Sequence, residues 1–161
     1  MEWTLDADRL DENPLMTVAG RAEIRELGAR HGVTVSSLTG DFLMQAPPLG
    51  VEGAEREQRL ATLERVIDAC GDLEIVHLVW PLVDDGRITG ASAENALTSL
   101  LTGRLVPLLR RRAVMIAFES DYPPAALSAF INRIPADLAG INYDTGNSAA
   151  LDYRPAEELE A

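Results

Sequence analysis

The sequence predicts an α/β protein with a parallel β-sheet. Short apolar runs alternate along the chain with longer segments whose apolar residues recur every three or four positions. Two of the runs are apolar at consecutive positions, as in strands of a parallel sheet that is covered on both faces. Each strand with its following helix takes up roughly 30 to 40 residues, which is typical of a repeated βα unit.

The apolar runs are predicted to be the strands of this sheet. They are MEWTL (1–5), VTVSSL (33–38), IVHLVWPL (75–82), AVMIAF (113–118) and LAGINY (138–143). The third and fourth lack the polar alternation of a half-exposed strand, so both of their faces are expected to be covered. His77, inside the third run, is therefore expected to be a core or barrel-lining residue more than a metal ligand.

Helices are predicted between these strands. The clearest covers about residues 55–71, where the apolar residues form one face. An earlier helix is expected from Thr17, whose hydroxyl can cap the first turn, to His31. Gly32 is placed to end that helix, because glycine readily adopts the left-handed conformation found at helix C-termini.

The second half of the chain carries two further predicted helices. A leucine-rich helix over about residues 92–112 contains Pro107. Its ring removes a backbone donor and crowds the preceding turn, so this helix is expected to kink or split. A shorter helix, carrying Leu127, Phe130 and Ile131, is expected after Pro123 and Pro124.

Composition narrows the class of protein. A chain of 161 residues with 47% hydrophobic residues is expected to form a single domain with its own core. Its net charge of −12, from 26 acidic and 14 basic residues, disfavours nucleic acid and anionic membranes as partners. The single cysteine, Cys70, permits no intrachain disulfide, and no apolar run reaches the roughly 18 residues that span a bilayer. With an acidic N-terminus in place of a signal peptide, we expect a soluble, cytoplasmic protein.

Acidic residues follow the predicted strands, at the edge where a parallel α/β protein places its chemistry. They are Asp6, Asp8, Asp41, Asp84, Asp85, Glu119, Asp121 and Asp144. Taken singly, most have ordinary explanations, since Asp is common in turns and solvated loops. Glu119 and Asp144 form the sharper pair, because each directly follows an apolar strand and they are 25 residues apart, one strand–helix–strand step.

Glu119 and Asp144 permit two interpretations. Neighbouring parallel strands lie about 4.8 Å apart, so both carboxylates can reach one cation, and hard divalent cations prefer such oxygen ligands. Without a cation, the two charges would repel each other or share a proton. Alternatively, Asp144 merely caps a turn.

Several motifs at these strand ends resemble a known family. FESD (118–121) and GINYDTGNSAALDYRP (140–155), together with SLTGDFLMQAPPL (37–49) and VWPLVDDG (79–86), are similar to the xylose isomerase-like (β/α)8 barrels known as sugar phosphate isomerases/epimerases. The resemblance covers nearly the whole chain. It implies a partial (β/α)8 (TIM) barrel of about five parallel strands alternating with helices, with residues 1–161 as a single incomplete domain.

The resemblance also implies a chemistry. Family members bind one divalent cation through a Glu, an Asp, a His and a second Glu, and Glu119 and Asp144 match the first two. Glu119 is then both a metal ligand and the catalytic residue that moves a substrate proton, with Mn²⁺, Mg²⁺, Co²⁺ or Zn²⁺ as the cofactor. Asp41, Asp84 and Asn147 are predicted to bind the sugar or sugar phosphate. Related nucleases often carry a His where this chain has Asn147, which disfavours nuclease activity.

The length of the chain departs from this pattern. A full barrel needs roughly 250 residues, so the chain looks truncated at both ends and matches about the second to sixth βα units. The matching His and second Glu would lie on strands that follow Asp144. Open sheet edges would then need cover from a second copy or from a complementing chain. The alternative function is a catalytically inactive α/β fragment that acts only as a binding or interaction module.

Overall fold

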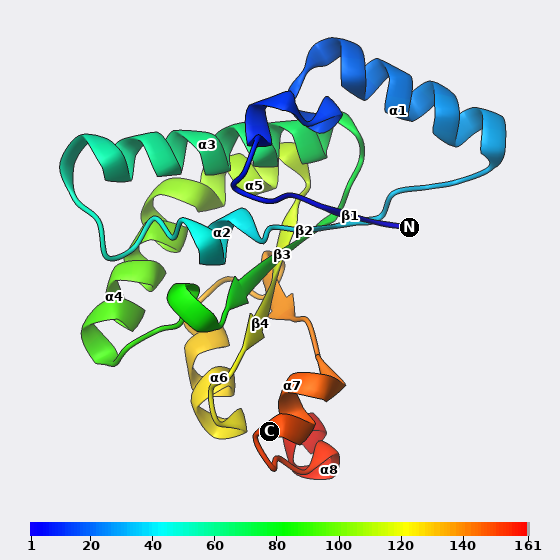
Figure 1. The fold of residues 1–161 in the computed structure, drawn as a ribbon. Helices are drawn as coiled ribbons and strands as arrows, with labels where there is room; N and C mark the ends of the chain where they lie inside the picture. The colour runs from blue at the N-terminus through cyan, green and yellow to red at the C-terminus, as the bar shows by residue number, and fades with distance from the viewer. Residues whose placement is uncertain (161) are drawn as a thin grey trace.

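A computed structural model describes residues 1–160, which contain a five-stranded parallel sheet (Figure 1). Its strands are β1 (Glu2–Thr4), β2 (Ser37–Thr39), β3 (His77–Leu82), β4 (Met115–Ser120) and β5 (Ala139–Ile141). They pair in chain order, β1-β2-β3-β4-β5, and each pair is parallel. The structure thus confirms the α/β class and the alternation of strands with helices.

Helices connect the strands. They are α1 (Val18–His31), α2 (Phe42–Gln45), α3 (Gly53–Asp72), α4 (Ala91–Leu100), α5 (Val106–Arg112), α6 (Pro124–Ile131), α7 (Thr145–Ala150) and α8 (Pro155–Glu160). The 3₁₀ segments η1 (Leu10–Glu12), η2 (Pro14–Met16) and η3 (Asp84–Gly86) lie in the loops, and η4 (Leu101–Leu105) is a π-helical segment. Among residues 1–160, no helix combines the length and the apolar character needed to cross a membrane.

The ends of α1 follow the predicted signals. The Thr17 hydroxyl accepts a hydrogen bond from the Gly20 N–H at 3.0 Å, which satisfies one of the free donors of the first turn. At the other end, Gly32 adopts a φ of 65°, and its N–H bonds to the Gly28 carbonyl. The predicted boundaries of this helix are therefore confirmed.

The predicted helix over residues 92–112 is split, as Pro107 indicated. Helix α4 passes into the π-helical segment η4, where the Val106 N–H bonds to the Leu101 carbonyl five residues earlier. Pro107 then lies in the first turn of α5, directly after this wider turn. The wider turn accommodates the proline within an otherwise continuous helical segment.

The predicted strand over residues 33–38 was wrong at its beginning. Strand β2 covers only Ser37–Thr39, and the residues before it have other partners. The Val33 N–H bonds to the Gly28 carbonyl at 3.0 Å and thereby completes the end of α1. The segment directly before β2 still lies beside the N-terminus, since the Ser36 N–H bonds to the Met1 carbonyl at 3.3 Å and the Met1 amino group donates to the Thr34 carbonyl at 2.9 Å.

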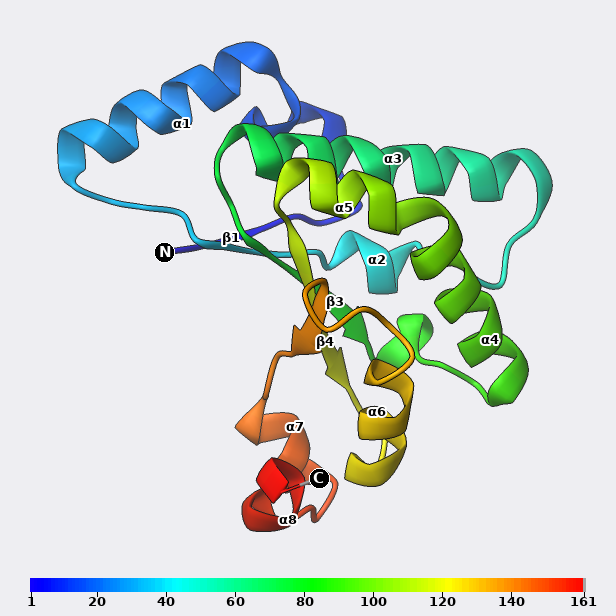
Figure 2. The same cartoon turned by 180° about the vertical axis from the view of Figure 1, so that it is seen from behind.

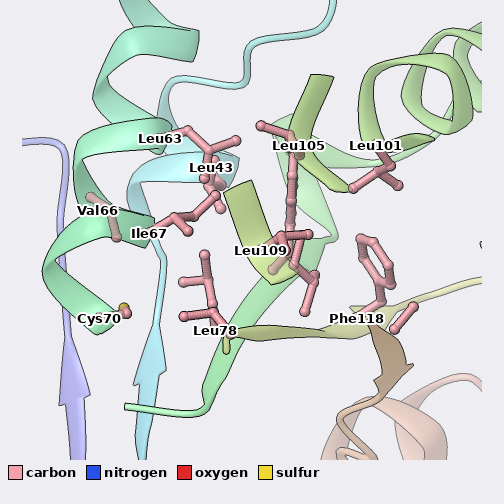
Figure 3. Close-up of a cluster of buried hydrophobic side chains, with 14 of the residues drawn as sticks. Leu43, Leu63, Val66, Ile67, Cys70, Leu78, Leu101, Leu105, Leu109 and Phe118 are labelled. Carbon is pink, nitrogen blue, oxygen red and sulfur yellow. The ribbon is translucent and has the colours of Figure 1, made fainter. Parts of the chain in front are cut away.

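The core lies between the sheet and the helices on one of its faces. Figure 3 shows apolar side chains of α3, η4 and α5 gathered on the side of the sheet that carries Leu78 of β3 and Phe118 of β4. Phe118 also contacts the ring of Phe130 in α6, with ring centroids 5.3 Å apart. Leu38, Leu78 and Ile116 form one row across the sheet under these helices, and all three are buried.

The opposite face of the sheet carries both polar and apolar side chains. Ser37, His77 and Met115 lie side by side in register, and all three are partly exposed. His77 thus has the lining position expected from the sequence. Viewed from behind in Figure 2, α3 and α5 lie side by side, α1 stands beside the β1 edge, and α7 and α8 lie at the other end.

Candidate functional site

The candidate site lies at the carboxyl ends of β4 and β5. Glu119 is the last but one residue of β4, pairs with Pro81 of β3 and is half-buried. Asp144 follows β5 after a two-residue extension and immediately precedes α7. The parallel order of the sheet therefore brings both predicted carboxylates to one rim, as the alternation of strands and helices indicated.

Glu119 is held by two asparagine amides. The Asn142 Nδ2 donates to Glu119 Oε2 at 2.9 Å, and the Asn147 Nδ2 donates to Glu119 Oε1 at 2.9 Å. Each carboxylate oxygen thus accepts one hydrogen bond from an uncharged donor. The arrangement fixes the plane of the carboxylate and leaves its negative charge without a paired cation among residues 1–160.

Asp144 caps helix α7. Its Oδ1 accepts hydrogen bonds from the Gly146 N–H at 2.6 Å and from the Asn147 N–H at 3.2 Å. The turn-capping interpretation is therefore correct as far as Oδ1 is concerned. Among residues 1–160, no donor contacts Oδ2, so the cap by itself leaves one oxygen for a ligand.

Neighbouring acidic residues of the rim raise the pKa values of Glu119 and Asp41. Burial raises the pKa of the Glu119 carboxyl, the two asparagine amides lower it, and the charges of Asp144 and Asp41 raise it again. Burial likewise raises the pKa of Asp41, with Asp6 and Glu2 adding to the shift. The rim is therefore a region of concentrated negative charge in which protonation, or a bound cation, relieves repulsion.

The remaining predicted site residues differ in whether they interact with Glu119. Asp41 is half-buried just before α2, and its charge acts on Glu119. Asp84 is exposed at the start of η3 with a left-handed φ of 50°, and no described interaction joins it to Glu119. Asn147 is part of the centre itself, because its amide contacts Glu119.

Two other acids of the rim are engaged by neighbours. Asp121 forms an ion pair with Arg87, at 3.1 Å between Nη2 and Oδ2. Asp6 accepts a hydrogen bond from the Gln45 Nε2 at 2.9 Å. Asp121 thus differs from Glu119 and Asp144, whose side chains meet only uncharged donors among the described residues.

Asn142 is a site residue that the sequence reasoning missed. It lies one residue beyond β5 and two before Asp144. In an extended segment, residues two apart point to the same side, so the alternation from Asn142 to Asp144 was an available signal. Tyr143 points elsewhere and donates to Glu158 Oε2 at 2.8 Å, and Ser148 donates to the same oxygen.

A small cavity of about 130 Å³ adjoins Glu119. Asn142, Asn147 and Tyr122 line its polar side, and Leu127 and Ile131 of α6 line its apolar side. Among residues 1–160, no lysine, arginine or histidine lines it. Its size is about that of a few water molecules, so it provides a recess beside the carboxylate and not a complete sugar-binding pocket.

The donor set fits a hard divalent cation in chemistry, because carboxylate oxygens are the ligands that such ions prefer. The number of ligand side chains fits such an ion only in part. Residues 1–160 contain no group of three or more His, Cys, Asp or Glu side chains placed to hold one ion. Glu119 and Asp144 could therefore supply two ligands, with water or further groups completing the coordination.

Fold and site together define a class of protein: a parallel βα array with paired carboxylates at the carboxyl ends of its strands, which corresponds to part of a TIM barrel. The sequence profile of the family described as xylose isomerase-like TIM barrel matches residues 2–161. The chain belongs to this family. A comparison with curated protein sequences gives no match.

Solved structures share this fold. The D-tagatose 3-epimerase-like protein has a TM-score of 0.71 and 16% identity, over 99% of this chain and 61% of that one. The xylose isomerase domain protein of Planctomyces limnophilus has a TM-score of 0.68 and 14% identity, over 99% and 67%. A xylose isomerase-like TIM barrel protein of Mycobacterium smegmatis, in complex with magnesium, has a TM-score of 0.66 and 18% identity, over 89% and 53%. This chain thus spans between 53% and 67% of the length of these proteins.

Proposed function

We propose that this chain is a metal-dependent sugar or sugar-phosphate isomerase/epimerase, or the part of one that carries half of its metal site. The observation that supports the proposal is the placement of Glu119 and Asp144 on adjacent strand ends with neither carboxylate neutralised by a described basic residue. Residues 1–161 are proposed to form one incomplete barrel domain, equivalent to the second to sixth βα units. Family membership and the sugar epimerase-like neighbour support the substrate class.

In this proposal, Glu119 and Asp144 hold the cation. A bound divalent cation supplies Lewis acidity, which makes a carbon next to a carbonyl group a stronger acid. Glu119 accepts the proton from that carbon. The proton is then delivered to the neighbouring carbon in an isomerisation, or a second group supplies a proton to the opposite face of the same carbon in an epimerisation. Asp41, Asp84 and the part of the Asn147 amide not bound to Glu119 are proposed to bind substrate hydroxyl groups.

The site assignment is tested by calorimetric titration with Mn²⁺. The wild-type chain is expected to bind one ion, and Glu119→Gln and Asp144→Asn are each expected to weaken that binding strongly, because each replaces an anionic ligand with a neutral one. Asp121→Asn is a matched control, since Asp121 lies on the same rim but pairs with Arg87. Unchanged Mn²⁺ affinity in Glu119→Gln would refute the assignment.

A second candidate function is supported by the absence of a three-ligand cluster among the described residues. In this alternative, the chain is a catalytically inactive α/β module that binds a ligand or partner. Mn²⁺ titration combined with light scattering distinguishes the two. One-to-one binding by a homogeneous species supports the enzyme, and absent binding with a polydisperse mass supports the inactive module.

A further inference from the structure

The side chains around Glu119 form a connected network and not a set of separate contacts. Asn142 comes from the extension of β5, and Asn147 comes from the first turn of α7, yet their amides meet opposite oxygens of one carboxylate at 2.9 Å each. Rotation of Glu119 about its last bond would break both hydrogen bonds. The two amides therefore act as a clamp, by which we mean Asn142 and Asn147 together.

Asp144 is connected to this clamp through one of its oxygens. Its Oδ1 accepts the Asn147 backbone N–H at 3.2 Å and so fixes the residue whose side chain holds Glu119. Its Oδ2 contacts no donor among residues 1–160. The two oxygens are thus available for different tasks, one structural and one directed to a ligand.

We propose that Asn142 and Asn147 are positioning residues for Glu119, and that Asp144 fixes Asn147 through Oδ1 while it offers Oδ2 to the cation. The part concerning the cation rests on the proposed function. The clamp itself does not, because it is defined by hydrogen bonds within the protein.

The chemistry of the donors explains why asparagine suits these positions. An ionised carboxylate has about four lone-pair directions, and the two amides occupy two of them, which leaves one on each oxygen. An arginine would also fix Glu119, but it would neutralise the charge that attracts a cation. An amide orients the carboxylate and preserves its charge, as expected of the groups that support metal ligands.

The positioning role is tested on Mn²⁺ affinity, which does not depend on turnover. Asn142→Ala and Asn147→Ala are each expected to weaken Mn²⁺ binding by about 10-fold or more, the usual effect of removing a group that supports a ligand. Asn132→Ala is the control, because Asn132 lines the same cavity without a described contact to Glu119. If both clamp variants bind Mn²⁺ as tightly as the wild type, the positioning role is overturned.

A second measurement needs no cation. NMR spectra of the cation-free chain are compared for the wild type and Glu119→Gln. The substitution replaces one of the two acceptor oxygens that the clamp contacts with an NH₂ group. The side-chain amide signals of Asn142 and Asn147 are expected to shift, and that of Asn132 to stay in place. If neither clamp signal shifts, the clamp is overturned. If they shift while the wild-type chain binds no Mn²⁺, the clamp is supported and the proposed function is contradicted.

Discussion

The N-cap of α7 gives a sharp prediction, because Asp144 combines a hydrogen-bonding role with a charge. Asp144→Ala removes both, whereas Asp144→Asn removes the charge and keeps an oxygen that can accept the Gly146 and Asn147 N–H groups. Asparagine and aspartate are about equally good N-caps. The difference between the two variants therefore isolates the hydrogen bonds from the electrostatic effect.

The magnitude follows from the contacts. Replacing a good N-cap by alanine costs about 0.5 to 2 kcal/mol, and two described N–H groups lose their acceptor here. Both variants also remove the charge that raises the pKa of Glu119, which relieves repulsion equally in each. The first turn of α7 is thus expected to be about 1 kcal/mol less stable in Asp144→Ala than in Asp144→Asn.

Amide hydrogen exchange at Gly146 and Asn147, followed by NMR, is the direct assay, because a six-residue helix can open without global unfolding. About 1 kcal/mol corresponds to roughly fivefold faster exchange in Asp144→Ala than in Asp144→Asn. The amides of β3 serve as the internal control and are expected to exchange alike in both variants. Equal loss of protection in the two variants would show that the side-chain oxygen does not cap the helix.

Three further predictions concern stability and reactivity. Gly20→Ala places a Cβ 2.6 Å from the Pro14 carbonyl carbon and is expected to lower the free energy of unfolding in urea by about 1 to 3 kcal/mol. Gly103→Ala has open space around it and is expected to be tolerated. Equal urea midpoints for the two variants would contradict this prediction. Burial raises the pKa of Cys70 to about 12, so the thiol is expected to resist thiol reagents until the chain unfolds, and rapid labelling of the native chain would contradict its buried position. Because burial and neighbouring acids raise the pKa of Asp41, the folded chain binds this proton more tightly than the unfolded chain and loses stability as pH rises above the ordinary value of 3.8. Asp41→Asn is expected to remove that loss, and an unchanged pH profile of unfolding would refute the shift.

The order of elements could be predicted from the sequence because it depends on local signals. Apolar runs identified all five strands, Thr17 and Gly32 marked the ends of α1, and Pro107 indicated the break before α5. The beginning of β2 could not be predicted in the same way. It depends on the pairing of Ser37 with Glu2, 35 residues earlier, and on the Val33 N–H, which bonds back to the end of α1.

For the site, too, some features could be predicted from the sequence and others could not. Strand phase was enough to bring Glu119 and Asp144 to one rim, since parallel strands end at a common edge. The capping of α7 by Asp144 was one of two interpretations of the sequence, and deciding between them required the positions of the backbone N–H groups. Asn142 was missed because its role depends on the reach of its side chain to a residue 23 positions earlier.

The unequal lengths of the strand pairings have a consequence for the dynamics of the site. Strands β3 and β4 pair over six positions, from His77 to Leu82, whereas β4 and β5 pair over three. Glu119 therefore stands on the most extensively paired ladder of the described sheet, and Asp144 follows a short one that opens more readily. An ion held by both carboxylates would link the strand with the shorter pairing to the strand with the longer one. By mass action, it would slow amide exchange in β5 and α7 far more than in β3.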